Sequence, residues 1–252
     1  MKYVNLKILI VLILILQFFS LSAQENDGKI EFKAGEKLEF IIFYGLINGG
    51  VATMELKEVV YNGNPAFHCY TQAKSTGITD KIYRVKDIYE SFFNPDDYLP
   101  YKSIRNINEG KYRRYDEAWY FHDKNVVKSK NKGIIDSVPD NIRDMVSTFF
   151  YLRTLNFDTL EVGDIIDINT FFDNEVFPFD MRFRGREKVK TKLGTFNCIK
   201  LVPFVEPGRI FKTEDDMTIW LSPDLKYAPV RIRFDLLIGS LKIDLIDHSG
   251  IY

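Results

Sequence analysis

The sequence contains little cysteine, histidine, proline or glycine. Its 252 residues include 2 Cys, 3 His, 9 Pro and 15 Gly. Two cysteines are too few for a scaffold held together by disulfides, or for a structural zinc site built from Cys ligands. The modest Gly and Pro content excludes a collagen-like or low-complexity chain. The chain must therefore be stabilised by a hydrophobic core of its own.

The sequence also lacks an excess of charge of either sign. There are 34 Lys and Arg against 35 Asp and Glu, which gives a formal net charge of −1. Proteins that bind nucleic acids generally need a basic excess to displace counterions, so no nucleic-acid partner is expected. A disordered chain would carry fewer aromatic residues, whereas this one has 21 Phe, 14 Tyr and 2 Trp. The composition is that of a globular protein.

The usual enzyme signatures are missing as well. The sequence has no G-x-S-x-G, P-loop, H-E-x-x-H or G-x-G-x-x-G motif. The acidic clusters at residues 96–97 and 214–216 lack the spacing of a calcium loop. We therefore expect a protein that is not an enzyme and that needs no metal or cofactor. A pair of carboxylates that cleaves glycosides is the enzymatic alternative, since sequence alone does not show which acidic residues converge.

The first 23 residues have the pattern of a secretory signal peptide. Lys2 and Lys7 precede an apolar run over residues 8–19, and the small residues Ser20, Ser22 and Ala23 follow. The apolar run is shorter than the roughly 20 residues that span a bilayer, although an uncleaved anchor is the alternative. We expect cleavage after Ala23, a short linker over residues 24–29 and a single β-rich domain over residues 30–252. The product would be soluble in the periplasm or the outer cell envelope.

Alternation of apolar and polar residues with a period of two dominates the rest of the chain. One face of a predicted strand carries Leu38, Phe40, Ile42 and Tyr44, and one face of another carries Val230, Ile232, Phe234 and Leu236. Tight-turn signals such as Asn62-Gly63 separate these runs and predict hairpins. The fold class expected is mainly β: a large curved antiparallel sheet, half-barrel or barrel-like, of roughly 10–12 strands. One amphipathic helix is expected near residues 140–155, starting at Pro139 and Asp140.

The aromatic residues suggest a binding function. A curved sheet with a helix across its mouth can enclose a cavity for an apolar or lipid-like ligand. We place Trp119, Phe149 and Phe150 near such a cavity, with the alternative that the aromatic face of the helix is core. The oligomeric state is not evident from the sequence. Cys69 and Cys198 either form one disulfide or remain two buried thiols.

Six basic residues occupy consecutive even positions, which is the most unusual local pattern. In a continuous strand they would share one face over roughly 33 Å. One interpretation is a surface for an acidic envelope partner or a membrane. The other is a solvated face that prevents edge pairing, with a bulge at Gly185 that interrupts the register. The residues are Arg182, Arg184, Arg186, Lys188, Lys190 and Lys192.

Several segments together resemble a family of exported bacterial proteins classed as domain of unknown function 3108. They are GEKL at 35–38, YGLINGGVA at 44–52, VPD at 138–140, FFYLR at 149–153, GRE at 185–187, LGTF at 193–196, IWLSPD at 219–224 and APV at 228–230. The resemblance implies an exported β-rich domain without an assigned activity, and no catalytic residues carry over. The layout is also similar to the curved half-barrels of periplasmic lipoprotein carriers, a likeness of fold only.

Overall fold

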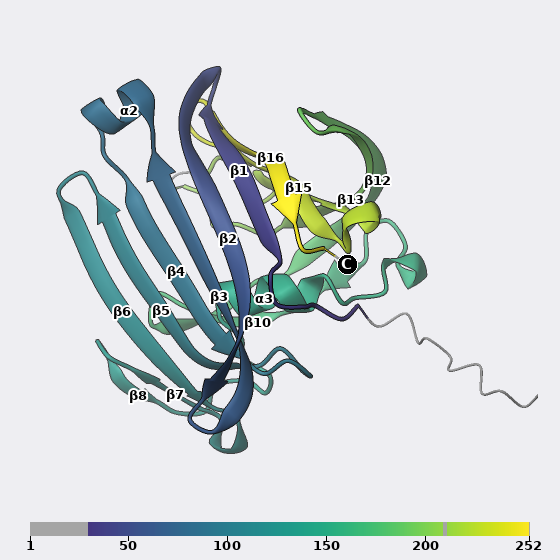
Figure 1. Ribbon diagram of the computed structural model, residues 1–252. Helices are drawn as coiled ribbons and strands as arrows, with labels where there is room; N and C mark the ends of the chain where they lie inside the picture. Colours follow the sequence, from purple (N-terminus) through teal and green to yellow (C-terminus); the bar gives the residue numbers. More distant parts are fainter. Residues whose placement is uncertain (1–29, 209–210, 252) are drawn as a thin grey trace, which may run out of the picture. The chain divides into compact units, whose positions relative to one another are not determined.

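The computed structural model describes residues 30–208 and 211–251 (Figure 1). The predicted signal peptide and linker lie outside the described residues. A compact unit runs from Phe32 to Tyr252, and it holds all the strands and helices described below.

Fourteen strands form one antiparallel sheet, in the order β8-β7-β6-β5-β4-β3-β2-β1-β16-β15-β14-β13-β12-β9. The first strand pairs with the last, so the two ends of the fold meet in the middle of the sheet. The bounds are β1 Lys37–Tyr44, β2 Ile47–Tyr61, β3 Asn64–Ser75, β4 Lys86–Phe93, β5 Pro100–Glu109, β6 Tyr112–Phe121, β7 Val126–Ser129, β8 Gly133–Ile135, β9 Ile165–Ile166, β12 Met181–Thr191, β13 Gly194–Pro203, β14 Met217–Ser222, β15 Ala228–Asp235 and β16 Ser240–Ser249.

The mainly β fold class is confirmed, with more strands than the 10–12 expected. The additional strands are short: β7 has four residues, β8 three and β9 two. Such strands are too short to show a period of two in the sequence. The sheet does not close into a barrel, because β8 and β9 remain its two edges.

Within the described residues, two helices and a separate hairpin complete the fold. The hairpin consists of β10 (Asn169–Phe172) and β11 (Glu175–Pro178), and the helices are α2 (Gly77–Ile82) and α3 (Met145–Leu152). Short 3-10 turns lie at His122–Lys124, Phe157–Thr159 and Pro223–Leu225. Neither helix of the described chain has the length and apolarity needed to cross a bilayer.

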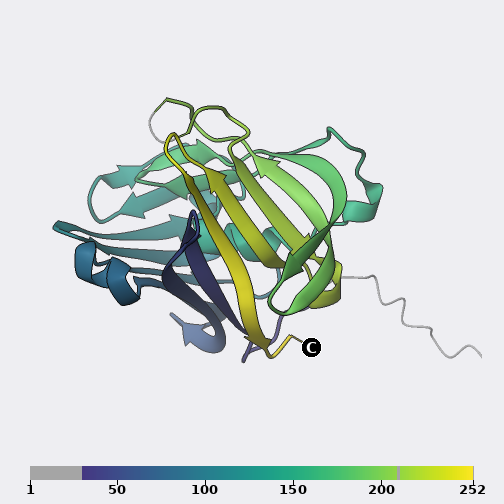
Figure 2. The ribbon, with the colours of Figure 1, turned by 90° about the horizontal axis from the view of Figure 1, so that it is seen from above.

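Helix α3 lies on the concave side of the sheet (Figures 1 and 2). Its Phe150 ring contacts Phe93 of β4, with 5.1 Å between the ring centroids. Its Leu152 belongs to a buried cluster with Phe183, Leu201 and Ile219 from β12, β13 and β14. A helix can contact strands this far apart in one sheet only if the sheet curves around it. The core therefore lies between α3 and the two ends of the sheet.

The helix starts later than the sequence predicted, at Met145 instead of Pro139 and Asp140. The preceding residue Arg143 is paired with β10: its N–H donates to Asn169 at 3.0 Å, and its carbonyl accepts from Phe171 at 2.6 Å. These backbone bonds hold the segment in an extended conformation. The helix can begin only after them, at the N-cap residue Asp144.

Candidate functional site

Aligned apolar side chains cross one half of the concave face. Ile42 of β1 pairs with Ile243 of β16, which pairs with Ile232 of β15, which pairs with Ile219 of β14. Directly paired residues of antiparallel strands point to the same face of a sheet. Ile219 is buried, whereas the other three are half-buried. They form the first apolar row, which lies partly open beside the core.

A second apolar row lies two residues further along the same strands. It consists of Tyr44, Leu241, Phe234 and Met217, joined by the same pairings. Phe211 stacks on Phe234 with 6.3 Å between ring centroids. Side chains two residues apart on a strand share a face, so the two rows form one apolar surface.

The other half of the same face carries a row of mostly polar side chains beside buried core residues such as Phe93. Along β2 to β6 the register aligns Met54, Thr71, Tyr89, Arg105 and Asp116. The polar row and the apolar rows belong to one face, because Phe40 of β1 pairs with Ala52 of β2. Ile42 lies two residues from Phe40, and Met54 lies two residues from Ala52, so these side chains point the same way. The concave face of the sheet is therefore amphipathic.

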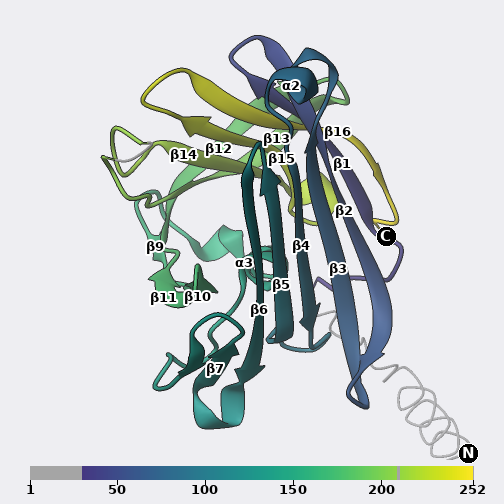
Figure 3. The same ribbon diagram turned by 90° about the vertical axis from the view of Figure 1, so that its left-hand side faces the viewer.

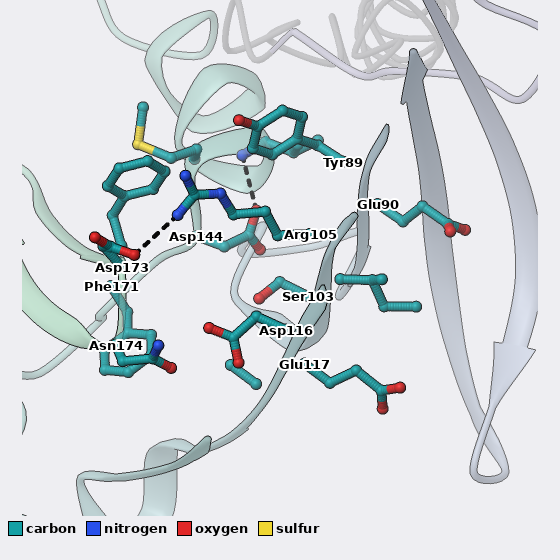
Figure 4. A pocket seen from close by; sticks show the side chains of 15 residues that line it. Tyr89, Glu90, Ser103, Arg105, Asp116, Glu117, Asp144, Phe171, Asp173 and Asn174 are labelled. Atoms are coloured by element: carbon teal, nitrogen blue, oxygen red, sulfur yellow. Dashed lines mark hydrogen bonds and ion pairs between the residues drawn. The ribbon is translucent and has the colours of Figure 1, made fainter. Parts of the chain in front are cut away.

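A small cavity lies where the polar row meets α3 and the β10–β11 hairpin (Figure 4). Tyr89, Arg105 and Asp116 point toward it, whereas Glu90 and Glu117 point away. Its volume is about 50 Å³, which is room for no more than a few water molecules. Two buried polar atoms here have no hydrogen-bond partner, Arg105 Nε and Asp116 Oδ1. An acyl chain does not fit in this cavity.

The Arg105 guanidinium is held in place by the β10–β11 hairpin. Its Nη1 donates to Asp173 Oδ1 at 3.1 Å, and its carbon lies 4.6 Å from the centre of the Phe172 ring. Arg114 contacts the same Asp173. Burial raises the pKa of Tyr89, so its hydroxyl stays a neutral donor. Arg105 therefore presents an oriented cation whose Nε–H has no hydrogen-bond partner.

The N-terminus of α3 is fixed by a buried capping box. Asp144 Oδ1 accepts from Val146 N at 2.8 Å and from Ser147 N at 3.1 Å, while its own N–H donates to Ser147 Oγ. Ser91 Oγ of β4 donates to the second carboxylate oxygen at 2.6 Å. Burial raises the pKa of Asp144 above its usual range, although these bonds oppose the shift. The carboxylate thus joins α3 to the polar half of the sheet.

Replacing Asp144 by asparagine should keep the fold stable, whereas Asp144→Ala should cost about 1–2 kcal/mol of unfolding free energy. The amide oxygen of asparagine still accepts from the helix N–H groups, and its NH₂ group can donate to Ser91. The folded state binds the Asp144 proton more tightly than the unfolded state, so stability falls as pH rises through the usual aspartate range of about 4. Denaturant titrations should therefore show Asp144→Asn gaining on the natural protein as pH rises from there to neutrality; a constant difference would contradict the raised pKa.

The family described as "Protein of unknown function (DUF3108)" matches residues 39–246. The chain belongs to the DUF3108 family. No curated protein matches it. The family resemblance inferred from the segments at 35–52, 138–153 and 185–230 is thereby confirmed, and the family carries no catalytic assignment.

Solved structures support the fold of this DUF3108 domain. A β-barrel-like protein of the domain of unknown function DUF1849 from Brucella abortus aligns with a TM-score of 0.59 at 10% identity, covering 88% of this chain and 100% of that one. A DUF1089 family protein from Pseudomonas aeruginosa aligns with a TM-score of 0.32 at 8% identity, covering 88% and 94%. The first likeness shows the fold alone, and the second is too low to compare.

The DUF3108 domain does not bring the three predicted ligand residues together. Trp119 lies on the face of β6 opposite to Tyr120, between the ammonium groups of Lys102 and Lys128, which are 5.2 and 5.9 Å from its ring centre. Phe150 is fully buried, and Phe149 is half-buried on the same helix. Trp119 points away from the concave face because side chains alternate along a strand, and its neighbour Tyr120 faces Phe171 of the β10–β11 hairpin.

The six basic residues from Arg182 to Lys192, five of which lie on β12, do not share one face, which corrects the interpretation as a continuous basic surface. Arg182 pairs with Val202 and Arg186 pairs with Ile199. Positions 202 and 199 of β13 point to opposite faces of the sheet, so Arg182 and Arg186 do too. The change occurs at the register shift between Phe183 and Arg186, where Gly185 has φ +87°. Arg182 and Arg184 both contact Asp215, and Arg186 contacts Asp158. After the shift Arg186, Lys188, Lys190 and Lys192 are exposed, and the three lysines have no ion pair at 4.0 Å or less within the described residues.

The two cysteines of the DUF3108 domain are buried free thiols, not a disulfide. Burial raises the pKa of Cys198 to about 11 and raises that of Cys69 further. Neither thiol is activated as a nucleophile. No cluster of three or more His, Cys, Asp or Glu side chains within residues 30–208 and 211–251 is arranged to hold a metal ion.

The sequence does not show that the residues of the apolar and polar rows lie side by side in the DUF3108 domain. Ile42, Ile232 and Ile243 were recognisable as members of alternating strands, but their alignment depends on the pairing of β1 with β16 and of β16 with β15. Arg105 gave no signal at all. Its position between Tyr89 and Asp116 follows only from the registers of β4, β5 and β6.

Proposed function

We propose that this protein is a non-catalytic binding protein of the cell envelope that holds an amphipathic, lipid-like molecule against the concave face of its sheet. The observation that carries the proposal is the amphipathic face itself. The two apolar rows on β1 and β14–β16 and the polar row on β2–β6 belong to one continuous surface.

The apolar part of the ligand would lie along Ile42, Ile243 and Ile232. These side chains are half-buried, so a chain laid over them removes further apolar surface from water. Each buried methylene contributes about 0.8 kcal/mol before the entropic cost of binding. A chain of about ten methylenes would thus contribute roughly 8 kcal/mol against the cost of association.

The polar end of the ligand would meet Arg105 and Tyr89. The Nε of Arg105 is buried without a partner, and the Asp173 carboxylate fixes the orientation of the guanidinium. A negatively charged or carbonyl oxygen of the ligand would satisfy the free N–H. The signal-peptide pattern of residues 1–23 supports a location in the cell envelope, where such ligands are abundant.

The alternative function, an interaction module that contacts an acidic partner through the basic face of β12, has less support. The strand exchanges its two faces at Gly185, and the three arginines already form ion pairs with Asp215 and Asp158. Only the lysines beyond Gly185 would remain for a partner.

Binding of a dansyl-labelled fatty acid by the chain from Gln24 onward tests the proposal. This chain contains the whole compact unit. We expect saturable binding that Ile232→Asp and Arg105→Gln each weaken about tenfold. Ile134→Asp, at a 66% exposed position of edge strand β8, is the matched control and should bind as the natural protein does.

Each variant is compared by thermal unfolding, and Ile232→Phe, which keeps the site apolar, should retain binding. Absence of saturable binding would overturn the proposal, as would equal loss in Ile232→Asp and Ile134→Asp. Native mass spectrometry of the protein purified from its producing cell should in addition show an adduct with the mass of a lipid.

A further inference from the structure

Four chain connections meet at one end of the sheet (Figures 1 and 3). They are the turns at residues 44–50, 109–113 and 235–240 and the α2 connection at residues 74–86. Hydrogen bonds join neighbouring connections: Tyr44 Oη donates to the Ile238 carbonyl at 2.8 Å, Thr76 N to Gly49 O at 3.1 Å, and Gly110 N to Arg84 O at 2.7 Å. We call these four connections the rim.

The rim carries most of the exposed large apolar side chains of the described structure. Of sixteen such residues, nine lie on it. Leu46 is 100% exposed, Ile238 80% and Ile82 79%. The other rim members are Tyr44, Ile47, Ile78, Tyr83, Tyr112 and Leu237. Single exposed apolar residues are normal on a protein, but their concentration on adjacent turns marks a contact surface.

The rim is also basic, although the whole chain is nearly neutral. Its exposed cations are Lys74, Lys81, Arg84, Lys86, Lys111 and Arg113. Its acidic residues are Asp80, Glu109 and Asp235, of which Asp80 contacts Arg84 at 4.0 Å and Asp235 contacts Arg233 at 2.7 Å. The rim segments therefore carry three more basic than acidic residues, whereas the chain has a net charge of −1.

A groove beside the rim gathers part of this positive charge. Its volume is about 300 Å³, and Arg84, Lys86 and Arg113 line it together with Asn106 and Asn108. Arg113 is held by bonds from Nη1 to the carbonyls of Gly110 and Tyr112, at 2.9 and 2.7 Å. The groove thus offers cationic and amide donors directly behind the apolar turns.

We infer that the rim is a docking surface for a membrane that contains anionic lipids. The apolar turns at Leu46, Ile82 and Ile238 enter the interface between head groups and acyl chains. The basic side chains behind them contact lipid phosphates, with one head group in the groove of Arg84, Lys86 and Arg113. The inference does not rest on the proposed ligand of the concave face, because no rim cation belongs to the polar row.

The arrangement of charge and apolar surface favours a membrane over a protein partner. The apolar residues sit on separate turns, Lys81 and Lys111 lie beside them on α2 and the β5–β6 turn, and Lys74, Lys86 and Arg113 lie at the adjoining strand ends. This order matches the depth profile of a bilayer surface, in which the acyl region lies beneath a layer of anionic phosphates. Long basic side chains can reach the phosphates while the turns are inserted.

Vesicle sedimentation with the chain from Gln24 onward tests the inference, since this chain lacks the apolar run at residues 8–19. We expect binding to vesicles of phosphatidylglycerol and phosphatidylcholine that exceeds binding to phosphatidylcholine alone and that falls with salt. The double variant Leu46→Ser, Ile238→Ser should bind about tenfold more weakly or less. Arg84→Gln and Lys86→Gln should each cost about fivefold.

Val60→Ser is the matched control, because Val60 is 76% exposed but lies at the opposite end of β2 from Ile47. It should bind as the natural protein does. A tryptophan placed by Leu46→Trp should shift its emission to the blue on vesicles, whereas one placed by Val60→Trp should not.

No binding to anionic vesicles, or equal losses in the rim variants and Val60→Ser, would overturn the inference. Binding of the dansyl fatty acid without vesicles should stay unchanged in the rim variants, so failure of the two proposals can be distinguished. If the rim variants lose a protein partner instead, with vesicle binding intact, the surface serves a protein.

Discussion

Replacing Arg153 by methionine is expected to lower the free energy of unfolding by about 3–5 kcal/mol. The Arg153 side chain is fully buried at the C-terminal end of α3. Its Nη1 and Nη2 donate to the two carboxylate oxygens of Glu36, at 2.5 and 3.0 Å. Its Nε donates to the Lys226 carbonyl at 3.0 Å.

The large effect comes from the partner that the substitution leaves behind. Glu36 is only 3% exposed, so without Arg153 its carboxylate is a buried charge without a counter-ion. Methionine fills much of the volume above Phe32, whose ring centre lies 4.5 Å from the guanidinium carbon, but supplies no donor. The pair joins the start of β1 to the end of α3, so its loss affects the middle of the sheet.

Urea denaturation of three proteins would measure this effect. Arg184→Met, at a half-exposed ion pair with Asp215, should lose less than about 1 kcal/mol. The double variant Glu36→Leu, Arg153→Met should regain a large part of the single variant's loss, since it removes both buried charges. A loss below about 1 kcal/mol in Arg153→Met alone would show that water reaches Glu36.

The sequence predicted the strands better than their alignment. Ile232 and Phe234 alternate with Arg231, Arg233 and Asp235, and this pattern is enough to predict a strand with one apolar face. The pattern does not identify the neighbour, and β1 pairs with β16, about 200 residues away in the chain. A surface built from four strands, such as the first apolar row, is therefore invisible until the registers are known.

Two local features show why other details were missed. The alternation of Arg182 to Lys192 assumes a continuous strand, and Gly185 at φ +87° interrupts it, a possibility that the glycine itself signalled. The start of α3 depends on bonds between Arg143 and the β10 strand, which lies more than 20 residues further along the chain. Long-range hydrogen bonds of this kind have no signature in the local sequence.

The cysteines and the rim illustrate the same limit. Whether Cys69 and Cys198 pair depends on their positions in the fold, and both turn out to be buried and free. Leu46 looks like an ordinary apolar residue beside a glycine turn. Only the structure shows that Leu46 is completely exposed and that its turn lies next to the exposed turn at Ile238.

Phe150→Ala is expected to destabilise the fold by about 3–5 kcal/mol, whereas Phe149→Ala should cost about 1 kcal/mol. Phe150 is 0% exposed, and its ring contacts Phe32 and Phe93 at centroid distances of 5.0 and 5.1 Å. Truncation therefore leaves a cavity beneath α3, while the half-buried Phe149 leaves a site open to solvent. Urea denaturation of the two variants gives the difference directly.

The two variants also distinguish a core role of Phe150 from contact with a ligand, which the helical pattern of Phe149 and Phe150 cannot do. A Phe150→Ala protein of natural stability that no longer binds the dansyl fatty acid would assign Phe150 to the ligand site instead of the core.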